Sequence, residues 1–385
     1  MESISFLFGI FIGILSGLIP GLHSNTVIVI LSSFDIPNEA MGAIIVAVFS
    51  SHLVTSFIPS IFFGIPSDSS VVSVLPGQRM VKEGNGIIAL KTVLASILFA
   101  TLVCIAIFSF SMDAFSVVYS AIKPYIGYIL LAFSAVFILI SKNRFLTLCI
   151  FLLAGILGQF SLNLKMYDVF LPLFSGFFAM SAILTYEKGA KIPKQKDNGV
   201  GIEIFGYALL GVALGFFADL LPGIGAPSQI AMLATIAIPM NSLGYLATIS
   251  SISASEAIFS FSTSASIGKT RMGATELLGK YVSIGDNLLF LLVLFLLSIA
   301  ISIAIIYFAR KLIGKIAEID FRKLNILIAL YLVAIIFVLN GTNGLIVLAL
   351  SSALGYTTVK LNVSRTTLMS AIIIPTLLLL FRIFI

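Results

Sequence analysis

The stretch GILSGLIPG, residues 13–21, decides the fold, because it recurs as GFFADLLPG at residues 215–223. The offset of 202 residues then holds without a gap through the next apolar block, where it pairs Ser51 with Ser253. Two apolar segments often match by chance, but Pro-Gly pairs and single glycines rarely keep one register over so long a stretch. This pattern is typical of an internal repeat. We therefore predict that the chain consists of two similar halves.

The composition places the chain in a membrane. Hydrophobic residues make up 59% of the 385 residues and charged residues 10%, whereas a soluble domain carries about 25% charged residues. A helical span needs about 20 apolar residues, so the apolar blocks leave room for roughly ten to twelve membrane elements and no soluble domain. We predict an all-α polytopic protein of the cell membrane, surrounded by lipid. The net charge of +6 comes from Lys and Arg in short loops, which is typical of topology signals and not of a nucleic-acid partner.

Loop charges predict how the halves are oriented. We assign residues 1–186 and 201–385 to the two repeats, and residues 187–200, the most hydrophilic stretch, to a basic cytoplasmic linker. The loop at residues 310–323 is basic, whereas its counterpart at residues 109–121 has no Lys or Arg. Equivalent loops are therefore predicted on opposite sides of the membrane. This indicates two inverted-topology repeats, as in many secondary transporters.

Each repeat begins with an apolar stretch, residues 4–33 and residues 204–236, that is broken by a Pro-Gly turn. Each arm is shorter than a full span, so we predict a re-entrant hairpin rather than two crossings. Broken backbone at membrane depth needs protein or a wet cavity around it, and a helix that restarts after such a turn offers free N–H groups to an anion. A kink in a packed helix is the alternative. The turns and the polar residues after them are our first candidates for substrate binding: Pro20, Gly21, His23, Ser24, Asn25, Thr26, Pro222, Gly223, Gly225 and Ser228.

A second break in each repeat, at residues 62–70 and residues 262–271, is rich in hydroxyl groups and small residues. The two breaks differ in charge, because Asp68 lies in the first whereas Lys269 and Arg271 lie in the second. A carboxylate among hydroxyls suits Na+ or a proton, and a guanidinium suits a substrate carboxylate or phosphate. Alternatively, the two basic side chains extend to the membrane surface. We add these residues to the substrate-binding candidates: Pro66, Ser67, Ser69, Ser70, Lys269, Thr270 and Arg271.

Ionisable residues inside apolar helices cost about 2.5–3.5 kcal/mol each, so they should face a cavity or a partner. His52, Asp219 and Glu256 are such residues, and His23, directly after a turn, can titrate near neutral pH. We predict Asp219 and Glu256, together with Asp68, as candidates for binding the coupling ion. The sequence has no cluster with metal-ligand spacing, so we expect no metal centre, no catalytic residue and no cofactor other than a coupling Na+. Glycines spaced four apart are assigned to close helix packing: Gly9, Gly13, Gly17, Gly211 and Gly215.

Three motifs resemble the large membrane subunit of the tripartite tricarboxylate transporters, the TctA-type permeases. They are GILSGLIPG at residues 13–21, FGIPSDSSVVSVLPGQRMVKEG at residues 63–84, and LPGIG at residues 221–225. The resemblance implies uptake of an organic di- or tricarboxylate driven by a cation gradient, with a small membrane subunit and an extracytoplasmic binding protein as partners. The chain departs from the family pattern at His23 and Asp68, and it is shorter than the usual member. The positions that the resemblance assigns to the substrate turns are Pro20, Gly21, Pro222, Gly223 and residues 66–70.

The sequence thus predicts a secondary active transporter that moves a small organic anion by alternating access, coupled to Na+ or H+. The alternative within transport is a translocase for a lipid-linked polyprenyl phosphate, whose headgroup Lys269 and Arg271 would suit. An intramembrane enzyme is a remote alternative, because residues 283–286 match a membrane aspartyl protease motif only in part and no zinc-type motif occurs. The oligomeric state, a homo-oligomer included, is left open.

Overall fold

The computed structural model describes residues 2–19, 22–63, 74–185, 193–220, 238, 240–268, 270, 272–316 and 321–383. Within these ranges the chain is helical and contains no strand, which confirms the predicted all-α class. Among the described residues, six helical stretches are long and apolar enough to cross a membrane: Asn38–Phe62, Gly86–Ala106, Phe108–Ile140, Arg144–Leu162, Leu288–Lys315 and Ala329–Lys360. Four shorter apolar stretches accompany them: Ser3–Leu18, Phe170–Met180, Ile204–Asp219 and Arg365–Leu380. These lengths agree with a multi-pass membrane protein.

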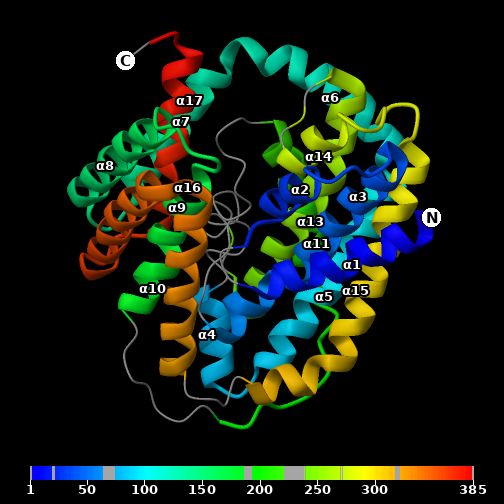
Figure 1. Ribbon diagram of the computed structural model, residues 1–385, viewed down its shortest axis with the longest axis horizontal. Helices are drawn as coiled ribbons and strands as arrows, with labels where there is room; N and C mark the ends of the chain where they lie inside the picture. Colours follow the sequence, from blue (N-terminus) through cyan, green and yellow to red (C-terminus); the bar gives the residue numbers. More distant parts are fainter. Residues whose placement is uncertain are drawn as a thin grey trace.

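The helices form two bundles, to the right and left of a central zone in Figure 1. The first bundle consists of α1 (Glu2–Leu18), α2 (Ser24–Leu31), α3 (Asn38–Thr55), η1 (Pro59–Phe63), α4 (Val74–Lys82), α5 (Gly86–Ala106), α6 (Phe108–Ile122), α11 (Ile204–Leu220), α13 (Ser242–Ile267), α14 (Gly273–Leu278) and α15 (Leu288–Ile316). The second bundle consists of α7 (Ile126–Ile140), α8 (Arg144–Leu162), α9 (Phe170–Phe174), η3 (Ser175–Met180), α10 (Ser181–Leu184), α16 (Phe321–Lys360), η4 (Arg365–Met369) and α17 (Ser370–Leu380). A short 3₁₀ turn, η2 (Lys123–Tyr125), connects α6 to α7 at the upper end of the view.

Each bundle combines helices from before and after the linker. In the first bundle α3 and α5 pack against α15 and α13, and in the second bundle α8 and η3 pack against α17 and α16. The two predicted halves are therefore interleaved in space. Their boundaries at residues 186 and 201 stay a prediction about repeats in the sequence.

Two central helices, α3 and α13, hold the first bundle together. Every residue from Ala40 to Thr55 and from Gly244 to Thr263 is buried. A helix without a polar face is typical of a position surrounded by other helices. Several serines of α13 donate within the helix, as when the Ser250 hydroxyl donates to the Leu246 carbonyl (2.8 Å), whereas Ser251 and Ser262 bond to α5 and α6. Small side chains of this kind let neighbouring helices approach closely.

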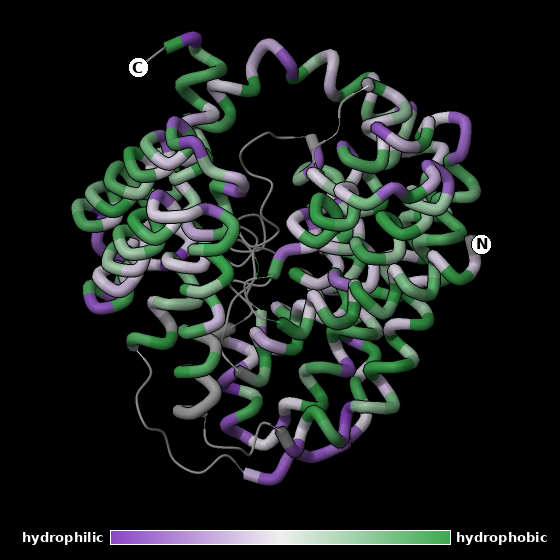
Figure 2. The backbone as a smooth tube through the Cα atoms, viewed as in Figure 1, coloured by the Kyte–Doolittle hydropathy of each residue, from purple (hydrophilic) through white to green (hydrophobic). Residues whose placement is uncertain are grey.

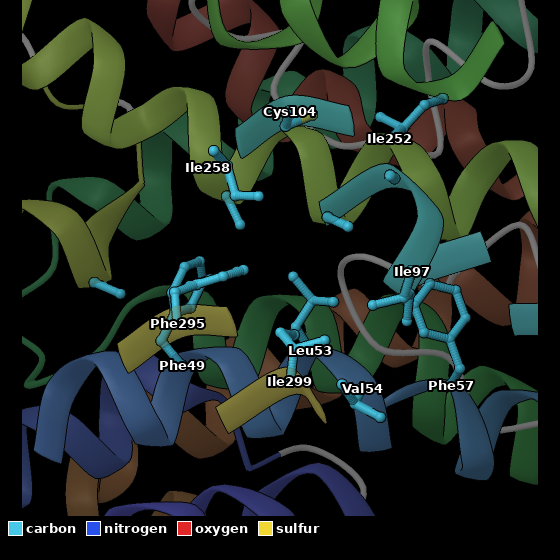
Figure 3. Packing of buried hydrophobic residues seen from close by; sticks show 14 of the residues in the cluster. Phe49, Leu53, Val54, Phe57, Ile97, Cys104, Ile252, Ile258, Phe295 and Ile299 are labelled. Carbon is cyan, nitrogen blue, oxygen red and sulfur yellow. The ribbon is translucent and has the colours of Figure 1, made fainter. Parts of the chain in front are cut away.

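Aromatic and branched side chains fill the space between these helices (Figure 3). The Phe295 ring of α15 lies between two others, with centroid distances of 6.3 Å to Phe49 of α3 and 6.0 Å to Phe261 of α13. Leu53 and Ile252 are buried in the same cluster. Because lipid is as apolar as these side chains, close packing rather than escape from water is the main attraction between the helices.

Glycines let α1 and α11 pack directly on the backbone of α3 and α13. A side-chain carbon at Gly13 would lie 2.6 Å from the carbonyl oxygen of Val48, and one at Gly211 would lie 2.6 Å from that of Thr248. Neither backbone position can yield without moving a helix. The predicted role in close packing is confirmed for Gly9, Gly13, Gly17, Gly211 and Gly215.

The two helix pairs pack alike, but not in the register that the sequence predicts. Gly13 and Gly215 are 202 residues apart, whereas the residues they contact on the next helix, Val48 and Ile252, are 204 residues apart. The first residues of α3 and α13 are also 204 apart. For α3 and α13, the ungapped register of the sequence comparison is therefore wrong by two residues. Runs of similar apolar and small residues match almost as well after such a shift, whereas contacts between helices do not.

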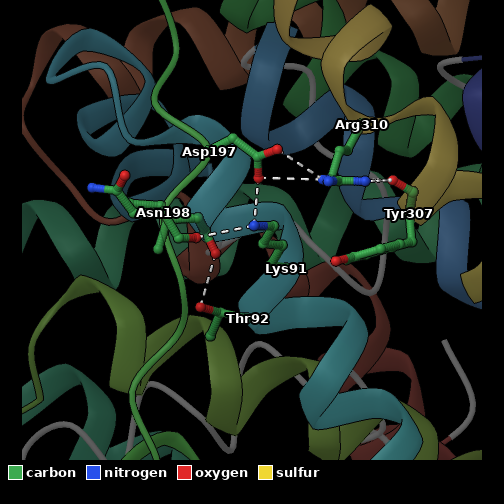
Figure 4. Close-up of polar contacts among 7 residues, drawn as sticks. Lys91, Thr92, Asp197, Asn198, Tyr307 and Arg310 are labelled. Carbon is green, nitrogen blue, oxygen red and sulfur yellow. Dashed lines mark hydrogen bonds and ion pairs between the residues drawn. The ribbon is translucent and has the colours of Figure 1, made fainter.

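Residues 193–200 of the linker lie along the first bundle (Figure 4). Asp197 forms ion pairs with Lys91 of α5 and with Arg310 of α15, where the distance from Nε to Oδ2 is 3.1 Å. The Lys91 ammonium also donates to the carbonyl of Asn198 (3.0 Å). Figure 2 shows hydrophilic residues gathered at this end of the molecule. Residues 193–200 are thus tied to two helices of one bundle.

α16 changes direction at Gly341, whose φ of 60° and ψ of −150° are open almost only to glycine. The bend interrupts one long apolar element rather than ending it. It brings Asn340 next to the start of α9, where the Asn340 side chain accepts a hydrogen bond from the backbone of Asp168 (2.9 Å).

Candidate functional site

A cavity of about 400 Å³ lies between the two bundles. The first bundle contributes the end of α1, the start of α2, the last turns of α3 and the start of η1. The second contributes the end of α8, the segment before α9, α9 itself, η3 and one residue of α17. Ligand sites are often found at such interfaces between packed units, because relative movement of the units opens and closes them.

His23 caps the start of α2. Its Nδ1 accepts a hydrogen bond from the backbone N–H of Asn25 (3.2 Å). One of the N–H groups that we predicted to be free for an anion is therefore used by the protein itself. His23, Asn25 and Thr26 line the cavity, whereas Ser24 is buried beside them and does not.

His52, in the last turn of α3, lines the same cavity. Its Nδ1 lies 2.9 Å from the hydroxyl of Ser16, and that hydroxyl donates to the carbonyl of Gly13 (2.9 Å). The ring centroid of His23 lies 5.8 Å from that of His52, at an angle of 43°. The prediction that this buried histidine faces a cavity or a partner is confirmed, because it has both.

Asp168 connects the second bundle to the first. The Thr26 hydroxyl donates to its Oδ2 (2.8 Å) across the cavity. Its Oδ1 accepts from the N–H groups of Phe170 and Leu171 (2.9 and 3.1 Å), which caps the start of α9. Its own N–H donates to Asn340 of α16. One residue thus joins α2, α9 and the bend of α16.

The rest of the cavity wall is largely apolar. Tyr167, Phe170, Phe174 and Phe178 line it from the second bundle. No Lys or Arg among the described residues lines it, so its polar groups are two imidazoles, one carboxylate, one amide and several hydroxyls. Such a lining suits a small ligand with a polar end and an apolar body.

A second group of ionisable side chains is buried inside the first bundle, apart from the cavity. Thr263 of α13 donates to Oδ2 of Asp219 in α11 (2.6 Å). Glu256 of α13 lies close enough to Asp219 for the two carboxyl groups to interact electrostatically. Asp219 and Glu256 are only 1% and 3% exposed. Within the described part of the chain, no group of three or more His, Cys, Asp or Glu side chains could hold a metal ion.

His52 and Glu256 occupy matching places in the two helix pairs. They are 204 residues apart, the offset that the glycine contacts give for α3 and α13. His52 lies beside Ser16 near the end of α1, and Glu256 lies beside Asp219 near the end of α11. The first pair therefore buries one of these ionisable groups, His52, whereas the second pair buries two, Asp219 and Glu256.

Comparison with known proteins identifies the family. Residues 4–203, just over half of the chain, match the tripartite tricarboxylate transporter TctA family. The chain belongs to the TctA family. An uncharacterized protein of Methanocaldococcus jannaschii is 27% identical to it over 401 residues, which cover 98% of each chain. No solved structure matches. TctA proteins are membrane transporters and not enzymes, so this TctA chain is a multi-pass transport protein.

Family membership leaves the roles of single residues in this TctA chain as predictions. Three of the substrate-binding candidates line the cavity: His23, Asn25 and Thr26. Thr270 is half-buried and does not line it. Ser24 is buried and does not line it either. The other substrate-binding candidates lie outside the described residues, as does the coupling-ion candidate Asp68: Pro20, Gly21, Pro66, Ser67, Ser69, Ser70, Pro222, Gly223, Gly225, Ser228, Lys269 and Arg271. The lipid-phosphate alternative depended on the last two, so nothing in the described part of the chain favours it.

Sequence reasoning missed the contribution of the second bundle to the TctA cavity. Asp168 stands directly before the apolar run that begins at Val169, and an acidic residue just before an apolar run is a signal for a helix start that could have marked it. Its pairing with Thr26 carries no such signal, because 142 residues separate the two.

Proposed function

We propose that this TctA-family protein is a secondary active transporter that moves a small organic anion through the cavity between its bundles, coupled to Na+ or H+. The observation that carries the proposal is the cavity itself, whose walls belong to two bundles that the Thr26–Asp168 hydrogen bond bridges. Movement of one bundle relative to the other would break this bond and change the side of the membrane from which the cavity is accessible. That is the requirement for alternating access.

The two matching helix pairs support an inverted-repeat scaffold. α1 packs on α3 as α11 packs on α13, through glycines at corresponding positions. By the usual rise per residue, α1 and α2 are about 25 Å and about 12 Å long, shorter than the roughly 30 Å hydrocarbon core. These lengths support a re-entrant first hairpin. In transporters of this architecture, substrate and coupling ions bind near such broken helices.

Asp219 and Glu256 are the proposed site of the coupling ion. Two buried carboxylates this close repel each other when both are ionised, and a bound Na+ or proton relieves the repulsion. The Thr263 hydroxyl holds Asp219 in place on one side. A cation gradient would then act on α11 and α13, the central pair of the second repeat.

The family name directs the choice of substrate and partners. We propose di- and tricarboxylates as the substrates to test first, and a small membrane subunit and an extracytoplasmic binding protein as partners. The apolar wall and the absence of Lys and Arg among the described lining residues favour the smaller and less charged of these anions.

Uptake into liposomes tests the proposal. The purified protein is reconstituted, and entry of radiolabelled succinate or citrate is measured under an imposed Na+ or pH gradient. We expect accumulation above the equilibrium level with one gradient, and competition by the unlabelled anion. Uptake no greater than in protein-free liposomes, for both anions and both gradients, would contradict a carboxylate transporter.

A further inference from the structure

We propose that α14 makes the binding of cation and substrate depend on each other, because it joins the carboxylate pair Asp219 and Glu256 to the cavity. In this link Gly273 is a positioning residue that acts on Asn25. The inference rests on the proposed function, and it deepens that function by naming the element through which the coupling ion acts. A continuous series of contacts leads from the cavity to the pair through α2, α14 and α13.

The first contact lies between α14 and α2, which are neighbours in Figure 1. A side-chain carbon at Gly273, the first residue of α14, would lie 2.6 Å from Nδ2 and 3.0 Å from Cγ of Asn25. The Asn25 side chain therefore fills the space that the side chain of any larger residue at position 273 would need. Because the φ angle of Gly273 is negative, its backbone does not require glycine. What requires glycine here is room for Asn25.

The Asn25 carboxamide is free to act on a ligand. It lines the cavity, whereas the backbone N–H of Asn25 bonds Nδ1 of His23. The side chain of Asn25 forms no hydrogen bond with another described residue, so packing against Gly273 sets its position. An uncharged carboxamide can both donate and accept hydrogen bonds. A shift of α14 therefore changes what the cavity offers to a polar group of the ligand.

A buried hydrogen bond anchors α14 to α13. The hydroxyl oxygens of Thr275 and Ser260 lie 2.7 Å apart, and both residues are at most 1% exposed. The Ser260 hydroxyl also donates to the carbonyl of Ala257 (2.7 Å), which can only accept. Its single hydrogen is used there, so Thr275 must be the donor to Ser260. The orientation of this bond is thus fixed.

One turn further along α13, Thr263 reaches the carboxylate pair. Its hydroxyl donates to Oδ2 of Asp219 (2.6 Å), and its oxygen also lies 3.2 Å from the carbonyl of Ser260. A hydrogen bond to an ionised carboxylate is about twice as strong as one between neutral groups. When a cation neutralises the pair, Asp219 therefore holds Thr263 less tightly. The end of α13 is then freer to move relative to α11.

α14 must follow such a movement of α13. Five residues, 268–272, connect the end of α13 at Ile267 to the start of α14 at Gly273. Together with the bond between Thr275 and Ser260, this short connection makes α14 and the last turns of α13 one unit. A movement of the unit displaces Gly273 relative to Asn25. Linkage requires the reverse as well, so a ligand that contacts Asn25 changes the affinity of the pair for the cation.

Calorimetry of anion binding measures this coupling. Succinate and citrate are titrated into the purified wild-type protein in NaCl and in choline chloride of equal ionic strength, at pH 7 and at pH 8.5. We expect the affinity for one anion to change at least about fivefold with one of the two cations, Na+ or H+, since coupling between sites is typically at least that strong. Affinities that depend on neither cation, in a protein that transports, would overturn the inference and leave the transport of the anion intact.

Substitutions of Thr275 test the anchor. Thr275→Val removes the donor to Ser260, so the change in anion affinity with the cation should fall below about twofold. Thr275→Ser keeps the hydroxyl and should restore the wild-type change. Thr358→Val is the control, because Thr358 is also buried and its hydroxyl donates to Leu354 of its own helix, α16. A wild-type change in folded Thr275→Val would overturn the role of α14.

A double-mutant cycle tests the contact between Gly273 and Asn25. Gly273→Ala should lower the anion affinity several-fold, because the methyl group displaces the carboxamide, and Asn25→Ala should lower it by removing the carboxamide. The double variant should bind no more weakly than Asn25→Ala alone, since the methyl group then has nothing to displace. The unfolding midpoint of Gly273→Ala should stay unchanged, because the three atoms nearest to the new carbon all belong to the Asn25 side chain. Additive losses of affinity would overturn the role of Gly273.

The outcomes are distinct for the function and for the link. If Thr275→Val does not fold, as judged by its elution and thermal unfolding in detergent, the double-mutant cycle and the cation dependence of the wild-type protein still decide. Failure of both anions to bind and to be transported by the wild-type protein would overturn the proposed function, and this inference with it.

Discussion

Asp168 accepts hydrogen bonds from both sides of the cavity, from Thr26 of the first bundle and from two N–H groups at the start of α9. The two kinds of bond have different roles. Loss of Asp168 would uncap α9 as well as separate the bundles, whereas loss of the Thr26 hydroxyl affects only the contact between bundles. Thr26 is therefore the position at which that contact can be tested alone.

We predict that Thr26→Val shifts the protein towards conformations in which the cavity is more open. A hydrogen bond to a charged group contributes about 1.5–3 kcal/mol, so a shift of roughly tenfold or more in the population is expected. The measurement is the rate at which a membrane-impermeant maleimide labels Ser175→Cys, a cavity position, after Cys104 and Cys149 are replaced by alanine.

Thr26→Ser is the matched control, because it keeps the hydroxyl and removes only a methyl group. Its labelling rate should stay near that of the parent protein. Equal labelling of the valine and serine variants would show that the Thr26–Asp168 bond does not hold the bundles together.

Single residues of the site could be predicted only where they stand out locally. His23, Asn25 and Thr26 were predicted because polar side chains directly after Pro-Gly are out of place in an apolar stretch. Asp168 lies in an ordinary polar loop before a helix, and what makes it part of the site is a partner on another bundle. The hydrogen bond between His52 of α3 and Ser16 of α1 joins two helices, and no spacing in the sequence reveals it.

At the scale of elements, glycine contacts fix how α1 and α11 pack. We predict that Gly13→Val destabilises the protein by about 1–3 kcal/mol, because the added side chain would push α1 away from the backbone of Val48. The thermal unfolding midpoint in detergent, followed by circular dichroism, should fall by several degrees.

Gly206→Ala serves as the control within α11. No atom lies within 4 Å of a side-chain carbon at Gly206, and alanine favours a helix interior by roughly 0.5–1 kcal/mol. Its unfolding midpoint should therefore stay the same or rise. A similar loss of stability in both variants would indicate that glycine content, and not close packing, matters in these helices.

The linker contact makes a prediction about pH. Hydrogen bonds from Lys91, and then from Arg310, lower the pKa of Asp197 below its usual value near 3.8. A carboxyl group whose pKa is lowered in the folded state stabilises that state at every pH above the ordinary pKa, and this stabilisation is lost as the pH falls through the lowered value. Hydrogen exchange of residues 193–200, corrected for intrinsic rates, should thus show equal protection from pH 5 to pH 8.

Asp197→Asn removes the negative charge that pairs with both Lys91 and Arg310. At pH 7.5 we expect faster trypsin cleavage after Lys194 and Lys196 than in the wild-type protein. Asp286→Asn is the control, since Asp286 is exposed and bonded to Ser283 of its own loop. Cleavage at the wild-type rate in Asp197→Asn would mean that the ion pairs do not hold the linker.

At the scale of the whole molecule, the coupling proposal makes the sharpest prediction. We expect Asp219→Asn and Glu256→Gln each to abolish accumulation driven by a cation gradient. Replacing one carboxylate by a neutral amide removes the repulsion between the two carboxylates, and with it the reason for a cation to bind there. Exchange of labelled for unlabelled anion at equal concentrations should continue, since it needs no net ion movement. Both are measured in the same liposomes.

Glu276→Gln is the control for these variants, because Glu276 is an exposed carboxylate of α14. It should accumulate anion like the wild-type protein. Gradient-driven accumulation that survives in both Asp219→Asn and Glu256→Gln would exclude this pair as the coupling site.

The sequence predicts the class of the whole molecule well and its packing poorly. Apolar blocks and Pro-Gly turns are visible in one dimension, so an all-helical membrane protein could be expected from composition and spacing. How the helices divide into bundles could not, because α3 meets α15 and α8 meets α17 through side chains that look alike on every apolar helix. The same uniformity hid the two-residue shift between α3 and α13.

The interleaving of the halves has a consequence for how the protein is made. The Ser51 hydroxyl of α3 is paired with Ser298 and Ser302 of α15, at 2.9 Å from each. At about 5–20 residues per second, synthesis reaches α15 only some 10–50 s after α3 has left the ribosome. Throughout that time the Ser51 hydroxyl of α3 lacks its native neighbours in the bilayer. The insertion machinery or other helices of the first half must therefore shield this hydroxyl from lipid until α15 has been inserted.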